Sequence, residues 1–297
     1  MQRILLRAVG WLPFPLLYGV AWLAYLLLYY VARYRRDVVR SNLERVFPEK
    51  TSAEITALGK NFYRHLSRSA LEILKARCMS PAEFSERMQL LNPEVIREYT
   101  EDFTRSVIVL TIHQGNWEWM LHGAIAELGI PIDPVYKPLH NKAVDDIVFD
   151  IRAQFGSRPL SVDESTKDIV KRRKEFRLFV MVADQSPTRH DRSYWTEFLG
   201  QESAFFLGAE VIAKMTRFPV VFAQCRRQKP GYYTLEFLPV ATPPYEKEGH
   251  AITEQYIEYA EAAIREQPET WLWSNRRWKR DRAVEEAREK AEQSPAS

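Results

Sequence analysis

The sequence of 297 residues contains only two cysteines, Cys78 and Cys225, and it lacks the short motifs of several large enzyme classes. Two cysteines provide neither a disulfide framework nor a C-x-x-C metal pair, which suits a reducing compartment. The chain contains no G-x-S-x-G, no G-x-x-x-x-G-K-[ST], no G-x-G-x-x-G and no H-E-x-x-H. These absences argue against nucleophile-elbow hydrolases, P-loop nucleotidases, dinucleotide-dependent enzymes and zinc peptidases that carry those motifs.

Charge of one sign is not in excess, because 42 lysines and arginines are balanced by 39 acidic residues and the net charge is only +3. This balance gives no reason to expect a nucleic acid partner, which proteins bind through a large positive surface. Hydrophobic residues make up 46% of the chain and charged residues 27%, as in globular proteins. A chain of this length forms one large domain or two small ones.

Residues 8 to 32 contain no charged side chain and are dominated by Leu, Val, Ala, Trp and Tyr. A helix that crosses a bilayer needs roughly 20 apolar residues, so this stretch is long enough for an anchor. Pro13 and Pro15 restrict regular helix to about residues 16 to 32. We therefore predict an N-terminal membrane anchor over residues 1–34.

Several arginines follow the apolar stretch directly: Arg33, Arg35, Arg36 and Arg40. They outnumber Arg3 and Arg7 on its other side, so the positive-inside rule favours a cytoplasmic location for the following domain. The stretch lacks the small-residue cleavage site of a signal peptide. Two alternatives stay open, a buried core helix and a helix that lies in the membrane interface or enters one leaflet.

Residues 105–125, RSVIVLTIHQGNWEWMLHGAI, contain the most informative pattern. The run from 107 to 112 is apolar and β-branched, which is typical of a buried strand. Asn116 is a good N-cap for the helix that the following apolar spacing predicts. His113 then lies at the carboxyl end of a strand, where open α/β sheets bind ligands. Glu118, in the first helical turn, is placed to reach back and hold the imidazole, although structural roles for both residues stay open.

Helices and strands alternate through the rest of the chain. Further strands are predicted at 132–136, 178–183, 219–223 and 232–237, the last with the alternation of an antiparallel strand. Helices are predicted at 141–155, 165–174, 205–215 and 252–264, and a long polar loop over 186–203. This order predicts an α/β fold with a mixed β-sheet covered by helices. We expect a catalytic domain over 35–282 and a charged helical or disordered tail over 283–297.

The H-x4-E pattern from His113 to Glu118 resembles the H-x4-D/E signature of glycerolipid-type acyltransferases. Its fuller form, His-Gln-Gly-Asn-Trp-Glu, is similar to the bacterial late acyltransferases of lipid A biosynthesis. Four other phrases strengthen the resemblance in the same order: N-L-x-x-V-F-P at 42–48, D-Q-x-P at 184–187, W-T-x-F…A-F-F at 195–206 and S-N-R-R-W-K at 274–279. The resemblance covers the chain from the apolar stretch to Arg280.

The resemblance implies a membrane-anchored O-acyltransferase of the bacterial inner membrane, with its catalytic domain on the cytoplasmic side. The donor is a fatty-acyl thioester, expected to be acyl carrier protein rather than coenzyme A, and the acceptor is a hydroxyl of a lipid A-type glycolipid precursor. A lysophospholipid or an aminolipid is the alternative acceptor. Neither a metal nor an organic cofactor is expected. Because no serine or cysteine occupies a nucleophile motif, we expect direct attack by the acceptor after His113 removes its proton as general base.

Further site residues follow from the resemblance. Arg152, in the R-x-x-x-G phrase that ends at Gly156, is the candidate catalytic oxyanion donor, with an exposed helical arginine as the alternative. Lys137 occupies the place of an arginine in relatives, and lysine is a poorer planar donor. The candidate substrate-binding residues are Asn116, Lys137, Asp184, Gln185, Arg189, Arg276 and Arg277. Asn275 stands where relatives usually have a histidine.

Two basic segments are candidates for contacts with acidic partners. The segment 271–280, WLWSNRRWKR, combines tryptophans with cations, and with an apolar stretch at the other end of the chain it favours a membrane interface over a nucleic acid. The run 171–174 ends a predicted helix and is either solvated or a contact for acidic headgroups or a carrier protein.

Two other function classes stay open. A metal-dependent hydrolase would use His113, Glu118 and His122 as ligands, although the H-E-x-x-H pattern is missing. A non-catalytic lipid-binding module would bind lipid without turnover.

Overall fold

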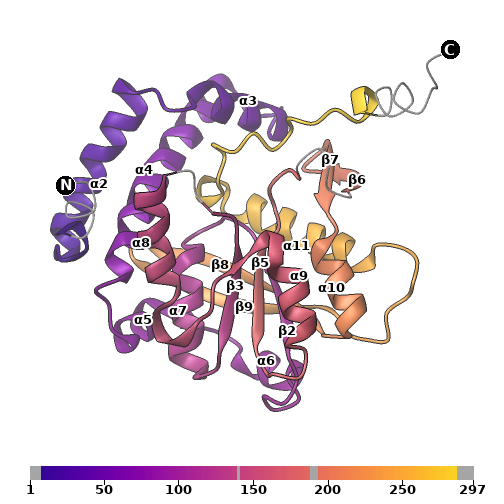
Figure 1. Ribbon diagram of the computed structural model, residues 1–297. Helices are drawn as coiled ribbons and strands as arrows, with labels where there is room; N and C mark the ends of the chain where they lie inside the picture. Colours follow the sequence, from indigo (N-terminus) through magenta and orange to yellow (C-terminus); the bar gives the residue numbers. More distant parts are fainter. Residues whose placement is uncertain (1–7, 139–140, 188–192, 286–297) are drawn as a thin grey trace.

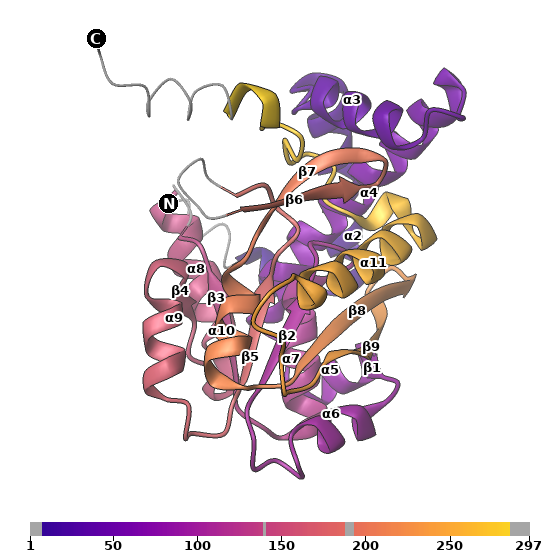
Figure 2. The same ribbon diagram turned by 90° about the vertical axis from the view of Figure 1, so that its right-hand side faces the viewer.

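The computed structural model describes residues 8–138, 141–187 and 193–285, and its central feature is a mixed β-sheet with helices on both faces (Figure 1, Figure 2). In these residues seven strands are ordered β1-β9-β8-β2-β5-β3-β4. β9 and β1 run opposite to the other five strands, which are parallel to one another. The predicted fold class is confirmed. The strands are β1 Met88–Leu90, β2 Val107–Thr111, β3 Ile132–Tyr136, β4 Leu160–Ser161, β5 Leu178–Val182, β8 Val220–Lys229 and β9 Tyr232–Ala241.

β2 lies in the middle of the sheet, between β5 and β8, and all of its residues are buried. Successive side chains of a strand point to opposite faces, so Val107 and Val109 join one core while Ile108 and Leu110 join the other. A strand that is buried on both faces needs a continuous apolar run, which is why the sequence pattern is so clear there.

Helices cover both faces of this sheet (Figure 2). The first face carries α5 Pro81–Arg87, α6 Pro93–Tyr99, α7 Trp117–Leu128 and α8 Lys142–Arg152, and the second carries α9 Val162–Lys171, α10 Gly208–Thr216 and α11 Ala251–Glu266. The longest helix, α4 Ser52–Ala76, starts at a capping box in which Thr51 and Glu54 satisfy each other's backbone N–H groups.

The N-terminal apolar stretch forms α2 Phe14–Leu26 and continues as the π-helix η1 Leu27–Val31, followed by α3 Arg36–Val46. Proline is tolerated in the first helical turn, so the helix begins before residue 16, where we predicted its start. By length and composition, Phe14–Val31 is the one helix in the described residues that is long and apolar enough to cross a membrane. Its buried face packs against α4.

The predicted long polar loop is wrong for the residues that the structure describes. β6 Ser193–Phe198 and β7 Gln201–Phe206 form an antiparallel hairpin. Its turn consists of Leu199 and Gly200, with φ angles of 53° and 75°, the left-handed geometry of a tight two-residue hairpin. Leucine rarely adopts this conformation, so no turn motif indicates the hairpin, and the helix predicted from residue 205 begins only at Gly208.

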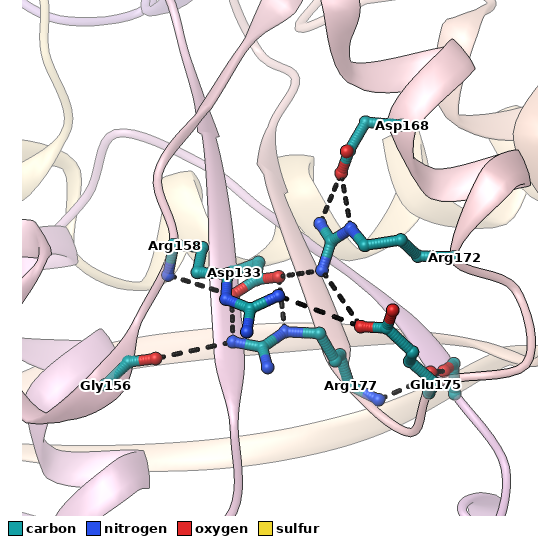
Figure 3. A network of polar contacts seen from close by, with 8 residues as sticks. Asp133, Gly156, Arg158, Asp168, Arg172, Glu175 and Arg177 are labelled. Carbon is teal, nitrogen blue, oxygen red and sulfur yellow. Dashed lines mark hydrogen bonds and ion pairs between the residues drawn. The ribbon is translucent and has the colours of Figure 1, made fainter.

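A buried ion-pair network lies at the amino end of β3 (Figure 3). Asp133 is fully buried and accepts hydrogen bonds from Arg172 at 3.0 Å and from the Arg158 backbone N–H at 2.9 Å. Arg177 makes two further short contacts with the same carboxylate. Because the buried carboxylate holds Arg172, the basic run 171–174 is partly a structural element and not simply a free cationic patch.

Candidate active site

The carboxyl ends of two neighbouring parallel strands bring His113 and Asp184 together. Thr111 at the end of β2 pairs with Val182 at the end of β5, so the residues two positions further along also meet. The His113 Nδ1 atom lies 2.6 Å from Oδ1 of Asp184, and the His113 backbone N–H donates to Oδ2 at 3.0 Å. The imidazole is therefore held by Asp184 and not, as we predicted from the sequence, by Glu118.

Asp184 is 2% exposed and also accepts a hydrogen bond from the Trp271 indole at 2.7 Å. Burial alone would raise the pKa of Asp184, but the His113 ring and the hydrogen bonds from His113 and Trp271 hold this pKa below its ordinary value. An ionised Asp184 assigns the ring proton of His113 to Nδ1 and leaves Nε2 able to accept a proton. The amide nitrogen of Gln185 lies 3.3 Å from that Nε2 atom.

Glu118 binds Arg152. The Arg152 Nε atom donates to Oε2 of Glu118 at 2.8 Å, and Nη2 makes a second, shorter contact with Oε1. The indole of Trp117 donates to the same Oε1 atom at 3.2 Å. Burial would raise the pKa of Glu118, but Arg152 outweighs that effect and lowers it. The first turn of α7 directs this carboxylate toward the last residue of α8, and within the described residues no hydrogen bond joins it to His113.

Arg152 is a partly buried cation that Glu118 holds in place. Its side chain is 17% exposed, and its guanidinium lies 5.5 Å from the centroid of the Tyr136 ring. It lines the same cavity as His113 and Glu118. Because Glu118 engages Nε and Nη2, the Nη1 atom has no hydrogen-bond partner in the described chain and is free to donate to a substrate oxygen.

Buried residues of α4 contact the turn between β2 and α7 and hold it in place. Gly115 has a φ of +61°, and a Cβ atom there would lie 2.6 Å from the Cys225 sulfur, so glycine is required. The buried His65 ring contacts the Gly115 carbonyl at 3.0 Å. Asn116 is also buried; it caps α7 by accepting from the Trp119 N–H at 3.1 Å. We predicted Asn116 as a substrate-binding residue, and its burial shows that it supports the turn instead.

Glu72 of α4 joins three distant segments, and sequence reasoning missed it. Its buried carboxylate accepts hydrogen bonds from Tyr18 in α2 at 3.0 Å, from Asn116 at 3.0 Å and from Tyr233 in β9 at 2.6 Å. Burial raises the pKa of Glu72, although each of these hydrogen bonds opposes the shift. The one available signal was an acidic residue three positions after Ser69, on the buried stripe of an amphipathic helix.

A cavity of about 720 Å³ lies across the carboxyl edge of the sheet. His113, Glu118 and Arg152 form part of its wall. Most of the rest is apolar and comes from both faces of the sheet, including Val109, Leu121, Val180, Leu235, Ala209 and Ile212. Its polar rim contains exposed side chains, namely Arg35, Lys137, Gln185, Arg276 and Lys279. This is the size and character of a site for a ligand with a long apolar part and a charged group.

The C-terminal basic segment is divided between the rim and the interior. Arg276, which we predicted as a substrate-binding residue, is exposed and lines the cavity, and Lys279 does the same. Arg277 is 2% exposed and donates to the Ala204 carbonyl at 2.9 Å, with its guanidinium 4.4 Å from the centroid of the Phe205 ring. Burial lowers the pKa of Arg277 to about 10. Its prediction as a substrate-binding residue is wrong, because a structural contact holds it inside.

The tryptophans of this segment are also structural, which contradicts the predicted interface role. Trp271 and Trp273 are 2% and 0% exposed. The segment runs along the turn between β2 and α7, where the Leu272 N–H donates to the His113 carbonyl at 3.0 Å and the Gly115 N–H donates to the Thr270 carbonyl at 3.1 Å. It therefore fixes the turn that carries the imidazole.

Two predictions remain, the role of Arg189 and the alternative of a metal site. Arg189 lies outside the described residues. Within those residues, no group of three or more His, Cys, Asp and Glu side chains is arranged to hold a metal ion. Glu118 is paired with Arg152, and His122 is fully buried between Phe84 and Phe155. The hydrolase interpretation has no support from this geometry.

The geometry is that of an imidazole and a fixed arginine beside an apolar cavity, and comparisons with known proteins agree with it. No curated protein matches the sequence. The model of one family, described as bacterial lipid A biosynthesis acyltransferase, matches residues 1–280. The chain therefore belongs to the bacterial lipid A biosynthesis acyltransferase family and is an acyltransferase.

Proposed function

We propose that this acyltransferase moves a fatty acyl chain from an acyl thioester to a hydroxyl of a lipid A-type glycolipid precursor. The observation that carries the proposal is that His113, held by Asp184, lies in the wall of a largely apolar cavity that Arg152 also lines. A base and a cation in the wall of an apolar cavity suit the transfer of a long acyl chain from a thioester sulfur to a hydroxyl oxygen.

In this mechanism the Nε2 atom of His113 removes the proton of the acceptor hydroxyl, and the resulting oxygen attacks the thioester carbonyl. Asp184 stabilises the imidazolium that forms. Arg152, oriented by Glu118, donates to the tetrahedral oxyanion through Nη1. The carbon–sulfur bond then breaks, and the imidazolium returns its proton to the departing thiolate. A new carbon–oxygen ester bond and a free thiol are the products.

The exposed cations at the rim of the cavity support a proposal about which acyl donor and which acceptor the protein binds. Lys137, Arg276 and Lys279 are exposed cations at its opening, and they complement the phosphates of a glycolipid precursor and the acidic surface of acyl carrier protein. We therefore propose acyl carrier protein as the donor. A lysophospholipid or an aminolipid remains the alternative acceptor, because the apolar cavity would also accommodate an acyl chain that is transferred to one of these lipids.

We further propose residues 1–34 as a membrane anchor, 35–282 as the catalytic domain on the cytoplasmic side of the inner membrane, and 283–297 as a tail. The apolar helix Phe14–Val31 and the arginines after it support this arrangement.

Mass spectrometry of total lipids tests the function directly. Cells that produce the wild-type protein should contain a glycolipid with one more acyl chain than cells that produce an equal amount of the His113→Ala variant. An unchanged glycolipid profile would contradict the proposed acceptor. An extra acyl chain on a phospholipid or an aminolipid would identify that lipid as the acceptor instead.

A further inference from the structure

The apolar N-terminal helix, α2 with η1, lies beside the part of α4 from Lys60 to Lys75 (Figure 1). Just before α2, a Cβ atom on Gly10 would lie 2.8 Å from the Leu74 carbonyl. Near the beginning of α2, Tyr18 donates to Glu72. At its end, the Tyr29 ring lies 5.4 Å from the Tyr63 ring. The two helices are thus antiparallel, and specific contacts join them from end to end.

The opposite face of α2 and η1 is exposed and strongly apolar. Of the sixteen large hydrophobic side chains that are exposed in the described residues, nine lie between positions 11 and 34. Leu16, Leu23 and Val31, spaced along this face, are 60%, 64% and 73% exposed. A contiguous apolar surface of this kind marks an interaction site.

Cations border this apolar face on the side of α4. The Arg64 guanidinium lies 5.8 Å from the Trp22 ring, and the Lys75 ammonium lies 5.5 Å from the Phe14 ring. Arg33 and Arg40 are exposed beyond the end of η1. An apolar strip with aromatic rings and flanking cations complements a lipid surface that carries anionic headgroups.

A bilayer-spanning helix is incompatible with this packing. α4 carries Arg64 next to Trp22 and Tyr25, in the middle of the apolar helix. Its Lys60 and Lys75 lie near the ends of the apolar helix. A spanning α2 would take Arg64 into the hydrocarbon, where a charge is strongly unfavourable. Separating the two helices would instead remove the Tyr18 donor from the buried Glu72 carboxylate and expose the apolar face of α4.

We propose that α2 and η1 lie in the plane of the membrane, with their exposed face in one leaflet and their other face on α4. This inference refines the proposed membrane association and does not depend on the acyl-transfer chemistry. Arg35, which follows η1, donates to the Ser274 carbonyl at 2.9 Å and lines the catalytic cavity. The cavity therefore opens next to the lipid surface, so that a lipid acceptor reaches His113 without leaving its leaflet.

Depth-dependent quenching tests this arrangement on the full chain. Single cysteines replace Leu16, Leu23 or Val31 in a Cys78→Ser, Cys225→Ala background whose thermal melt matches the wild type. Each is labelled with a fluorophore and bound to phosphatidylethanolamine–phosphatidylglycerol vesicles that contain nitroxide lipids of different depth. All three labels should report the same shallow depth. A deep Leu23→Cys label between two shallow ones would overturn the proposal.

Two controls complete the experiment. A label at Glu98→Cys, exposed on α6, should not be quenched, whereas no quenching at any of the three helix positions would show that the face has no lipid partner. In sealed inner-membrane vesicles, an impermeant maleimide should reach Ala8→Cys and Ser41→Cys from the same side. Labelling from opposite sides would contradict an in-plane helix whether or not the protein transfers acyl groups.

Discussion

At the scale of single residues, the proposed chemistry depends on the contact between His113 and Asp184. Replacing His113 with Ala should lower kcat by roughly 100-fold or more, the usual effect of losing a general base. Asp184→Asn keeps the shape but loses the charge that selects the ring tautomer, so we expect a loss of similar size. The double mutant should be little worse than the single ones, because the pair acts as a unit.

The measurement is a detergent-based acyl-transfer assay with thermal melts of every variant. Glu127→Gln, an exposed acidic residue on α7, is the matched control and should retain wild-type activity. A folded His113→Ala protein with activity within a few-fold of the wild type would remove the proposed base.

The pair of Glu118 and Arg152 gives a second prediction. If Glu118 acts by orienting Arg152, then Glu118→Gln should lower kcat strongly in the wild type and only slightly in an Arg152→Gln background. KM should change less than kcat, because the arginine acts on the tetrahedral oxyanion. If Glu118 instead acted on the imidazole, its coupling would be to His113, and the Arg152 background would leave its effect intact.

Two buried histidines predict how stability depends on pH. Burial lowers the pKa of His65 to about 3, with Arg227 contributing, and lowers that of His122 to about 4. The unfolded chain therefore binds protons below about pH 6.5 that the folded chain does not. The free energy of unfolding should fall as pH drops from about 6.5 toward these values, by about 1.4 kcal/mol per pH unit for each histidine.

Chemical denaturation at several pH values measures this dependence, and the difference between wild type and His122→Leu isolates one group. Leucine fits the apolar surroundings of Phe84 and Phe155, so the variant should lose less stability on acidification. Parallel curves for the two proteins would show that His122 is protonated equally in both states.

At the scale of elements, the sequence predicted what local patterns control. The strand before His113, the strand that ends next to Asp184 and the helix capped by Asn116 each have a clear apolar period or cap, and all are confirmed. The meeting of His113 with Asp184 depends on the register of two strands separated by more than 60 residues, which no local pattern specifies. The hairpin at Leu199 was missed because its turn places leucine in a glycine-like conformation.

The contact between α2 and α4 gives the proposed anchor, residues 1–34, a structural role as well. Their deletion should remove the protein from membranes and should also lower its Tm by several degrees, because it uncovers α4 and takes a donor from Glu72. Tyr18→Phe removes only that donor, so we expect a loss of about 1–3 kcal/mol with normal membrane binding. Thermal melts and membrane fractionation of both variants measure these effects. A truncated protein with the wild-type Tm would show that this packing contributes nothing.

At the scale of the whole molecule, the exposed cations of the rim should strengthen binding to anionic membranes. Arg276→Gln combined with Lys279→Gln should weaken binding to anionic vesicles, most at low salt, without changing the thermal melt. Arg277→Gln is the contrasting variant. It replaces a buried cation that contacts the Ala204 carbonyl, so it should lower Tm. Equal vesicle binding by the double variant and the wild type at low salt would exclude these side chains from the interface.

Glu72 gives the fold a property that reaches across the whole molecule. Its carboxylate lies between Tyr18, on the helix that we place in the membrane, and Asn116, which begins the catalytic helix. If lipid contact with α2 changes the order of the turn at Asn116, the linkage acts equally in both directions. A lipid that raises the affinity for substrate by some factor has its own affinity raised by that same factor when substrate binds. A substrate that orders the turn would then tighten the hold of the protein on its membrane.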